Sequence, residues 1–324
     1  MSSSHLSRPL LRAVGLIVSF FSAAFIARVL CSQWDLISSW RPPAGAFFII
    51  GTGILVYAAN GVLLSSAYWH LLLWAGEPRA AWGDVSRIYG RSQIAKYIPG
   101  NVAQFLGRHV IGRQCGWSHT GLLLAGIFEL FSLLSVAAII AVSGMALQEV
   151  IRNGMGLPAM MALGGGTFMG MVLLLRFGPV LIKHRWPGVA ARLNQCRLRG
   201  LWPAFLFHVG FFFVSGIIFL LIGMVVFETP LQLSLWPGVV GLMALAWAAG
   251  VIAPGAPSGL GVRESVLIFG LGSLVPTGEA LLASALFRVV TVGGDILFFL
   301  VAARMKGPFQ GFPPASEKRT DGIV

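Results

Sequence analysis

Residues 86–117 read SRIYGRSQIAKYIPGNVAQFLGRHVIGRQCGW and form a basic stretch between two long apolar runs. The stretch holds five arginine or lysine residues and no acidic residue. Pro99 and Gly100 lie at its centre, where proline removes a backbone donor and glycine permits a sharp turn. The stretch therefore predicts an amphipathic helix, a break at Pro99-Gly100 and a second short helix.

A related stretch, APGAPSGLGVRE, occupies residues 253–264. In both stretches an arginine follows the Pro-Gly proline by nine residues, Pro99 to Arg108 and Pro254 to Arg263. Paired segments interrupted by glycine and proline, one in each half of a membrane protein, indicate the binding site of a transporter. The alternative is that both stretches are connecting turns with a chance spacing, since Pro-Gly is common in loops.

Composition places the chain in the membrane. Of its 324 residues, 56% are hydrophobic and only 10% are charged, whereas soluble domains carry roughly 25% charged residues. The formal net charge is +12, but no polar basic stretch could form a separate nucleic-acid-binding domain. Anionic lipid headgroups are therefore the expected partner, and nucleic acid is not. The three cysteines lie far apart without a CxxC motif, so no disulfide framework, metal site or cofactor is expected.

The apolar runs predict an all-α polytopic membrane protein with about eight spans, because a spanning helix needs roughly 20 apolar residues. The seventh run is short for a full crossing, and residues 1–29 are interpreted as an uncleaved first span. One membrane domain would cover residues 1–306, with possible halves 1–156 and 157–306. The polar tail 307–324 is expected to be disordered. The eight candidate spans are residues 11–30, 44–74, 121–147, 157–175, 201–227, 233–253, 265–275 and 280–303.

Positive charge predicts the orientation. Arginine and lysine are concentrated before the first span, in residues 79–113, in residues 176–199 and in the tail. The opposite side receives only Arg28, Arg41 and Arg152. This bias predicts a protein of the bacterial inner membrane with both termini on the cytoplasmic side. Eight full crossings would make the two halves parallel repeats, whereas a Pro-Gly segment that returns on its own side would make them inverted.

Three charged residues lie well away from the ends of the predicted spans, where charge is costly and usually faces a partner or a wet cavity. They are Glu129 in the third span and Arg288 and Asp295 in the eighth. Arg288 and Asp295 lie seven residues apart and so share roughly one helix face. They line a polar path for a headgroup or, alternatively, Glu129 and Arg288 form a buried ion pair that only fixes packing.

The two breaks supply further candidates, because arginine forms forked bonds to phosphate and a helix N-terminus offers free amides to an anion. For Arg87 and Arg113 the positive-inside rule is the preferred explanation, whereas Arg108 and Arg263 are preferred as functional residues. The predicted phosphate-binding residues are Arg91, Lys96, Arg108 and Arg263, the predicted path residues are Glu129, Glu264, Arg288 and Asp295, and the predicted break residues are Pro99, Gly100, Pro254, Gly255, Gly259 and Gly261.

The strings Lys-Tyr-Ile-Pro-Gly at 96–100 and Gly-Leu-Gly-Val-Arg-Glu at 259–264 carry a resemblance. Over residues 11–303 the chain resembles the membrane region of the lysylphosphatidylglycerol synthase/flippase family. The resemblance implies movement of an aminoacylated phospholipid between leaflets, or of a polyprenyl-linked glycan or hopanoid as in stand-alone relatives. The family's cytosolic aminoacyl-transferase domain is not expected here. The sequence Ala-Pro-Ser at 256–258 departs from the plainer glycine-rich run of the family, so substrate contacts there are expected to differ.

A lipid translocase without catalytic residues is therefore the leading hypothesis. No ATP-binding motif occurs, so uphill movement would need an ion gradient or metabolic pull. One alternative is a membrane enzyme acting on a lipid-linked sugar, for which Glu77 and Asp84 are the only acidic pair near the first break. The other is an accessory subunit that works with lipid-modifying or glycan-synthesis enzymes.

Overall fold

The computed structural model describes residues 38, 40–98, 103–153, 191, 198–253 and 257–305. Within these residues every regular element is a helix and there is no strand, which confirms the predicted all-α class. The elements are α3 (Ala46–Trp74), α4 (Trp82–Gln93), η1 (Ile94–Tyr97), α5 (Ala103–Gln114), α6 (His119–Asn153), η2 (Leu198–Leu201), α9 (Trp202–Val226), η3 (Leu233–Leu235), α10 (Trp236–Ile252), η4 (Pro257–Gly259), α11 (Val262–Leu271) and α12 (Thr277–Arg304).

Five helices in the described residues are long and apolar enough to cross a membrane, which confirms a multi-pass membrane protein. They correspond to the second, third, fifth, sixth and eighth predicted spans. The predicted spans 11–30 and 157–175 and the tail 307–324 lie outside the described residues. The described part does not reach the predicted count of eight. The seventh predicted span is α11, whose 10 residues extend only about 15 Å against a hydrocarbon core of about 30 Å.

Local sequence sets where the long helices begin and end. Helix α3 stops where Gly76 adopts a left-handed φ of 86°. The amides of Gly76 and Glu77 donate to Leu73 and Leu72 at 3.1 and 2.9 Å, which satisfies carbonyls that the helix end would leave unpaired. Helices α9 and α10 each carry a proline in the first turn, where its missing amide costs nothing.

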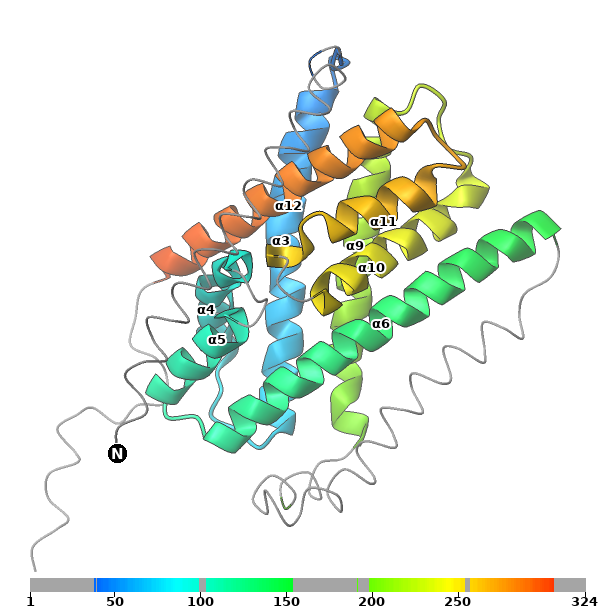
Figure 1. The fold of residues 1–324 in the computed structure, drawn as a ribbon. Helices are drawn as coiled ribbons and strands as arrows, with labels where there is room; N and C mark the ends of the chain where they lie inside the picture. The colour runs from blue at the N-terminus through cyan, green and yellow to red at the C-terminus, as the bar shows by residue number, and fades with distance from the viewer. Residues whose placement is uncertain are drawn as a thin grey trace, which may run out of the picture.

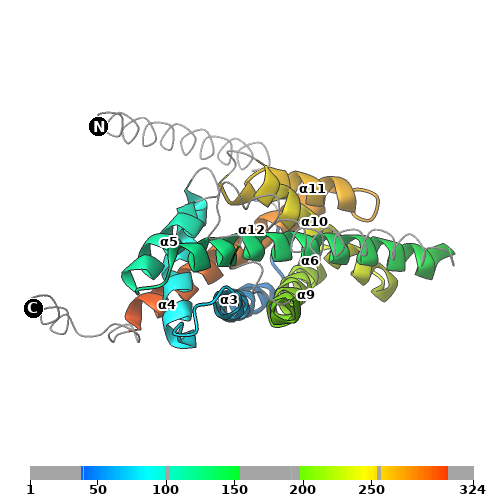
Figure 2. The same cartoon turned by 90° about the horizontal axis from the view of Figure 1, so that it is seen from below.

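The helices pack into one bundle, in which α3 and α9 contact each other and lie side by side along one edge in Figure 2 (Figures 1 and 2). Helix α12 packs on α3 and α4, and α6 packs along α10. Glycine allows the close approach of α6 and α10, because a Cβ on Gly144 would lie 2.2 Å from the carbonyl oxygen of Pro237. A Cβ on Gly241 would lie 2.9 Å from the carbonyl oxygen of Ala141.

Two hairpins of broken helix complete the bundle. One runs through α4, η1 and α5, and the other through α10, η4 and α11. They approach from opposite ends of the molecule in Figure 1, and α3 and α9 run in opposite directions between them. The two interruptions η1 and η4 contact each other, so the hairpin tips meet inside the bundle.

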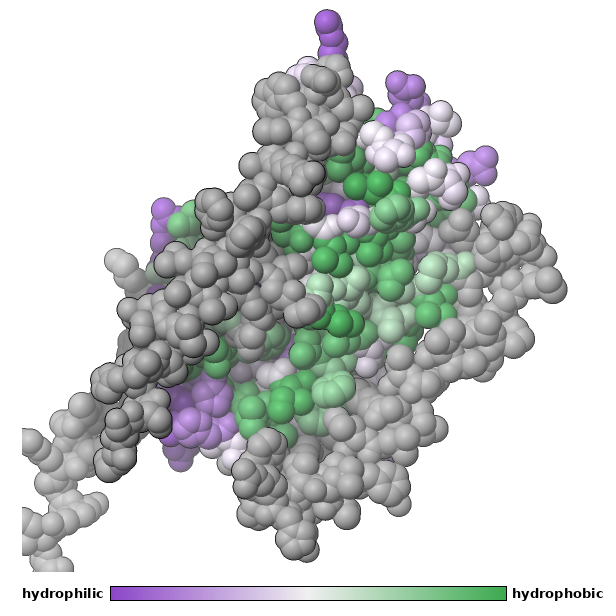
Figure 3. All heavy atoms as spheres, in the orientation of Figure 1, coloured by the Kyte–Doolittle hydropathy of each residue, from purple (hydrophilic) through white to green (hydrophobic). Residues whose placement is uncertain are grey.

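The visible surface of the described residues is apolar in its middle and polar near its ends (Figure 3). In Figure 3 apolar residues cover the middle of the described surface, and hydrophilic residues gather near its two ends. Large apolar side chains such as Phe213, Ile217 and Leu221 on α9 are exposed. An apolar belt between polar ends is the surface that a bilayer requires.

Candidate functional site

Glycine and a strained serine build the tip of the second hairpin. Ser258, Gly259 and Gly261 have φ values of 51°, 68° and 82°, a region that glycine adopts freely and most other residues avoid. A Cβ on Gly259 would lie 2.4 Å from the Cα of Gly250, so the tip presses directly on α10. The predicted break residues Pro99, Gly100, Pro254 and Gly255 lie outside the described residues.

The first charged cluster joins α4, α5 and α6. Arg108 and Glu129 form an ion pair, and their side chains are 2% and 0% exposed. The Tyr89 hydroxyl donates to the other carboxylate oxygen of Glu129 at 2.7 Å. The Arg108 guanidinium also lies 3.9 Å from the centre of the Tyr89 ring. The buried carboxylate of Glu129 is therefore matched by one cation and one hydroxyl.

The second cluster fastens the first hairpin to α12. The Lys96 Nζ lies 2.6 Å from the Oδ2 of Asp295, and the Tyr97 hydroxyl donates to the same oxygen at 2.6 Å. Both donors come from η1, immediately before the predicted break.

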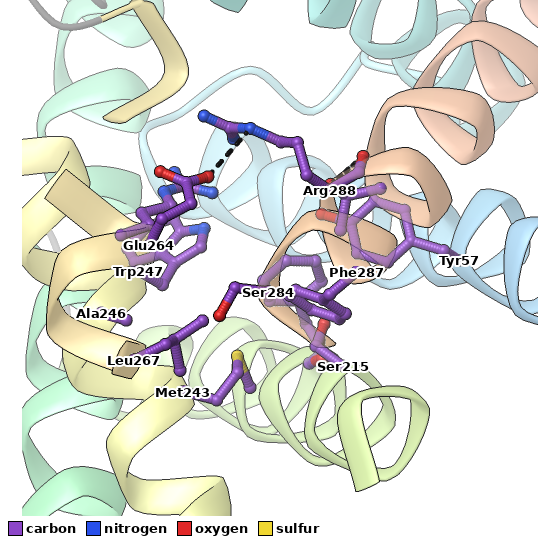
Figure 4. Close-up of a pocket in the computed structure, with 13 residues that line it drawn as sticks. Tyr57, Ser215, Met243, Ala246, Trp247, Glu264, Leu267, Ser284, Phe287 and Arg288 are labelled. Atoms are coloured by element: carbon purple, nitrogen blue, oxygen red, sulfur yellow. Dashed lines mark hydrogen bonds and ion pairs between the residues drawn. The ribbon is translucent and has the colours of Figure 1, made fainter. Parts of the chain in front are cut away.

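The third cluster fastens the second hairpin to the same helix. The Arg288 Nε lies 3.2 Å from the Oε1 of Glu264, an ion pair that Figure 4 shows as a dashed line. Arg288 Nη1 donates to the carbonyl oxygen of Ser258 at 3.1 Å. The other oxygen of Glu264 accepts from the amide of Gly261 at 2.6 Å, so the glutamate at N3 caps the free backbone amide at the start of α11.

These contacts correct the predicted ion pair between Glu129 and Arg288. Each pairs with a different residue, Glu129 with Arg108 and Arg288 with Glu264. The physical reason is that the hairpins insert between the spans and bring closer partners to both charges. Helix α12 turns Arg288 toward one hairpin and Asp295, two turns away, toward the other.

Two cavities lie at the hairpin tips, and together they contain most of the predicted site. A cavity of about 50 Å³ is lined by Lys96, Arg108, Glu129 and Arg263. Arg108 and Arg263, the two residues preferred from their spacing after the breaks, thus line the same cavity. The second cavity, of about 30 Å³, is lined by Arg263, Glu264 and Arg288 and is shown in Figure 4. Spaces of this size hold a few water molecules.

Arg263 lies in both cavities and differs from the other charged residues at the site. Its guanidinium carbon lies 5.7 Å from the centre of the Trp247 ring. Within the described residues it has no ion-pair partner, and its buried Nε has no hydrogen-bond partner. An arginine side chain keeps its positive charge at neutral pH.

Arg91 is placed apart from the cavities. Its guanidinium donates to the carbonyl oxygens of Ala302, Ala303 and Met305 at 3.3 to 3.4 Å, at the end of α12. An arginine there stabilises the last carbonyls of a helix. The predicted helix N-termini also differ from expectation, since the Gly261 amide at the start of α11 is occupied by Glu264.

Glu77 and Asp84, the acidic pair considered for a membrane enzyme, form contacts away from the cavities. Glu77 accepts from the amide of Ser118 at 3.2 Å and from its hydroxyl, at the start of α6. Asp84 pairs with Arg87 at 3.1 Å, one helical turn away. Neither acid lines the two cavities.

Sequence reasoning missed the aromatic part of the site. Tyr57, Phe211 and Trp247 line both cavities, and Tyr89 bonds to Glu129. Aromatic residues are so common in apolar helices that no sequence signal separates these from packing residues. Tyr97 was within reach of prediction, because it adjoins Lys96 in the Lys-Tyr-Ile-Pro-Gly string.

No family model matches the chain, and no curated protein matches it. The function of the chain is therefore inferred from the geometry of its hairpins and cavities.

Proposed function

We propose that this protein is a lipid translocase of the bacterial cytoplasmic membrane, with both termini in the cytoplasm. The observation that carries the proposal is the polar cavity at the meeting point of the two broken hairpins, inside a bundle with an apolar surface. A headgroup would enter this cavity between the hairpin tips while its acyl chains stay in the bilayer. The proposal covers phospholipids, aminoacylated lipids and polyprenyl- or hopanoid-linked lipids.

The arrangement of the hairpins supports transport. We assign α3, α6, α9 and α12 as crossing helices and treat both hairpins as segments that enter the membrane and return on the same side. Under this proposal the two halves are inverted rather than parallel repeats. Discontinuous helices that meet near the midplane are a common design of transporter binding sites.

The ion pairs give the site a closed state. The cavities have room for water but not for a phospholipid headgroup. Entry of a headgroup therefore requires at least one hairpin to move away from α12. The two contacts that would part are Lys96 with Asp295 and Arg288 with Glu264. Side chains of the Arg288–Glu264 pair are 16% and 21% exposed and those of the Lys96–Asp295 pair 13% and 5%, against 2% and 0% for Arg108–Glu129. The Arg288–Glu264 pair therefore parts at the lowest cost and the Arg108–Glu129 pair at the highest.

A reconstitution experiment tests the proposal. Purified protein is placed in liposomes that contain a trace of acyl-labelled fluorescent phosphatidylglycerol, and an impermeant quencher reports which leaflet the label occupies. Wild-type protein should accelerate exchange between leaflets over protein-free liposomes. Arg263→Gln should slow exchange strongly, whereas Arg199→Gln, which removes an exposed arginine outside the cavities, should not. Equal exchange with and without wild-type protein, for every lipid tried, would contradict the proposal.

A further inference from the structure

The charged groups at the two cavities are unequal in number. Four cations line the cavities, namely Lys96, Arg108, Arg263 and Arg288. The carboxylates that line them or pair with their lining residues are Glu129, Glu264 and Asp295. Each carboxylate has one cationic partner within 3.2 Å.

The remaining charge belongs to Arg263. Among the described residues it has no carboxylate within ion-pair distance. The face of Trp247 offers only partial compensation. A half-buried guanidinium with a buried, unpartnered Nε and no counter-ion is unfavourable, so a ligand that brings one negative charge would stabilise the site.

We propose that Arg263 makes this site selective for a headgroup with one net negative charge carried on phosphate, and that aminoacylated, cationic headgroups are disfavoured. The inference rests on the proposed lipid translocation and narrows its substrate class. A phosphate diester supplies two oxygens and one charge to the fork of Arg263. It adds no ammonium group that would need a carboxylate.

A cationic headgroup meets the opposite situation. An added ammonium needs a carboxylate, and all three carboxylates at the cavities already hold a lysine or an arginine. To bind, it would have to displace Lys96, Arg108 or Arg288 and leave that cation buried without a partner. The site is therefore poorly suited to the aminoacylated lipid that the sequence resemblance implies.

Aromatic residues favour a lipid over a soluble phosphate. Tyr57, Phe211 and Trp247 line both cavities, and the polar groups lie within an apolar bundle. Inorganic phosphate shares the charge of the headgroup but offers no acyl chains to occupy the surrounding bilayer. The test therefore includes it as a separate ligand.

The experiment compares three fluorescent lipids with the same acyl chains in liposomes that contain the wild-type protein. They are anionic phosphatidylglycerol, zwitterionic phosphatidylethanolamine and cationic lysylphosphatidylglycerol. Phosphatidylglycerol should cross fastest, roughly tenfold or more ahead of the lysyl lipid, as expected for one charge-assisted contact. Parallel liposomes report uptake of labelled inorganic phosphate, which should stay at the protein-free level.

Variants of Arg263 assign the preference. Arg263→Lys keeps the charge and should keep the order of the lipids. Arg263→Gln should abolish the preference, and Arg263→Glu should reverse it. Arg199→Gln is the matched control. Elution as a single species in detergent shows that each variant is folded. If Arg263→Gln and Arg263→Glu do not fold, the order of the three lipids with the wild-type protein decides whether the site is selective for charge.

The outcomes separate the two proposals. If no lipid moves faster than in protein-free liposomes, the proposed function fails. If lipids move at equal rates, or the lysyl lipid moves fastest, only the charge selectivity fails. If phosphate enters while no lipid moves, the ligand is a soluble phosphate and the lipid assignment is overturned.

Discussion

Glu129 is completely buried. Its carboxylate forms an ion pair with Arg108 and accepts a hydrogen bond from the Tyr89 hydroxyl. A buried ion pair adds little net stability, but removal of one partner leaves an uncompensated charge. Arg108→Gln should therefore reduce the free energy of unfolding by about 3–5 kcal/mol. The double variant Arg108→Gln/Glu129→Gln should be more stable than either single variant.

Unfolding of the purified protein in detergent, with a double-mutant cycle, measures this coupling. Arg288→Gln is the control, because Arg288 pairs with Glu264 instead. It should show no coupling to Glu129→Gln. Additive losses for Arg108 and Glu129 would mean that the two residues do not meet in the folded protein.

Which residues are charged and buried could be predicted, because charge inside an apolar run is costly enough to indicate a partner. Which residues pair could not. Glu129 could reach Arg288 only if α6 and α12 met at that depth, and the sequence does not show that α5 brings Arg108 to Glu129 first. Arg263 was predicted to bind phosphate from its spacing after the break, and it lines both cavities. Its lack of a counter-ion depends on all three pairs around it.

At the scale of elements, the two broken segments were predictable and their course was not. Proline and glycine disfavour a continuous helix on chemical grounds. Helix α10 nevertheless has the length and composition of a span, and only its contacts with α11 and η4 show it to be one arm of a hairpin. The length and hydropathy of an apolar run do not show whether it crosses the membrane or returns to the side from which it entered. The sequence therefore predicts a seventh span at α11, although α11 is too short to cross.

Cysteine labelling tests the hairpin assignment. In a background without the native cysteines, Gln114→Cys at the end of α5 should react with an impermeant reagent from the cytoplasmic side. Ser273→Cys, after α11, should react from the opposite side, since both positions are exposed. Ser258→Cys at the tip, where the serine is 4% exposed, should react slowly from either side.

The tip position separates the two topologies. If α10 crosses the membrane completely, residue 258 would emerge in the cytoplasm. Labelling of Ser258→Cys as fast as Gln114→Cys from that side would therefore contradict a hairpin that returns inside the bundle. A denatured sample, in which all three positions are accessible, controls for the reactivity of each thiol.

At the scale of the whole molecule, α12 connects the two hairpins. It forms an ion pair with the first hairpin through Asp295 and with the second through Arg288. Its last carbonyl oxygens accept hydrogen bonds from Arg91. A movement that parts one of these ion pairs leaves the other in place. The bundle is therefore suited to opening at one hairpin at a time, as alternating access to a central site requires.

The central claim is that a lipid headgroup enters the cavity between the hairpin tips. The most direct measurement uses a phosphatidylglycerol analogue with a small photoreactive group on its headgroup, cross-linked to the protein in liposomes and located by peptide mass spectrometry. We expect labelled peptides to contain cavity residues such as Tyr57, Phe211 and Trp247, and unlabelled phosphatidylglycerol to reduce the yield. Labelling confined to the exposed outer face, for example around Phe213 and Ile217, would contradict the claim.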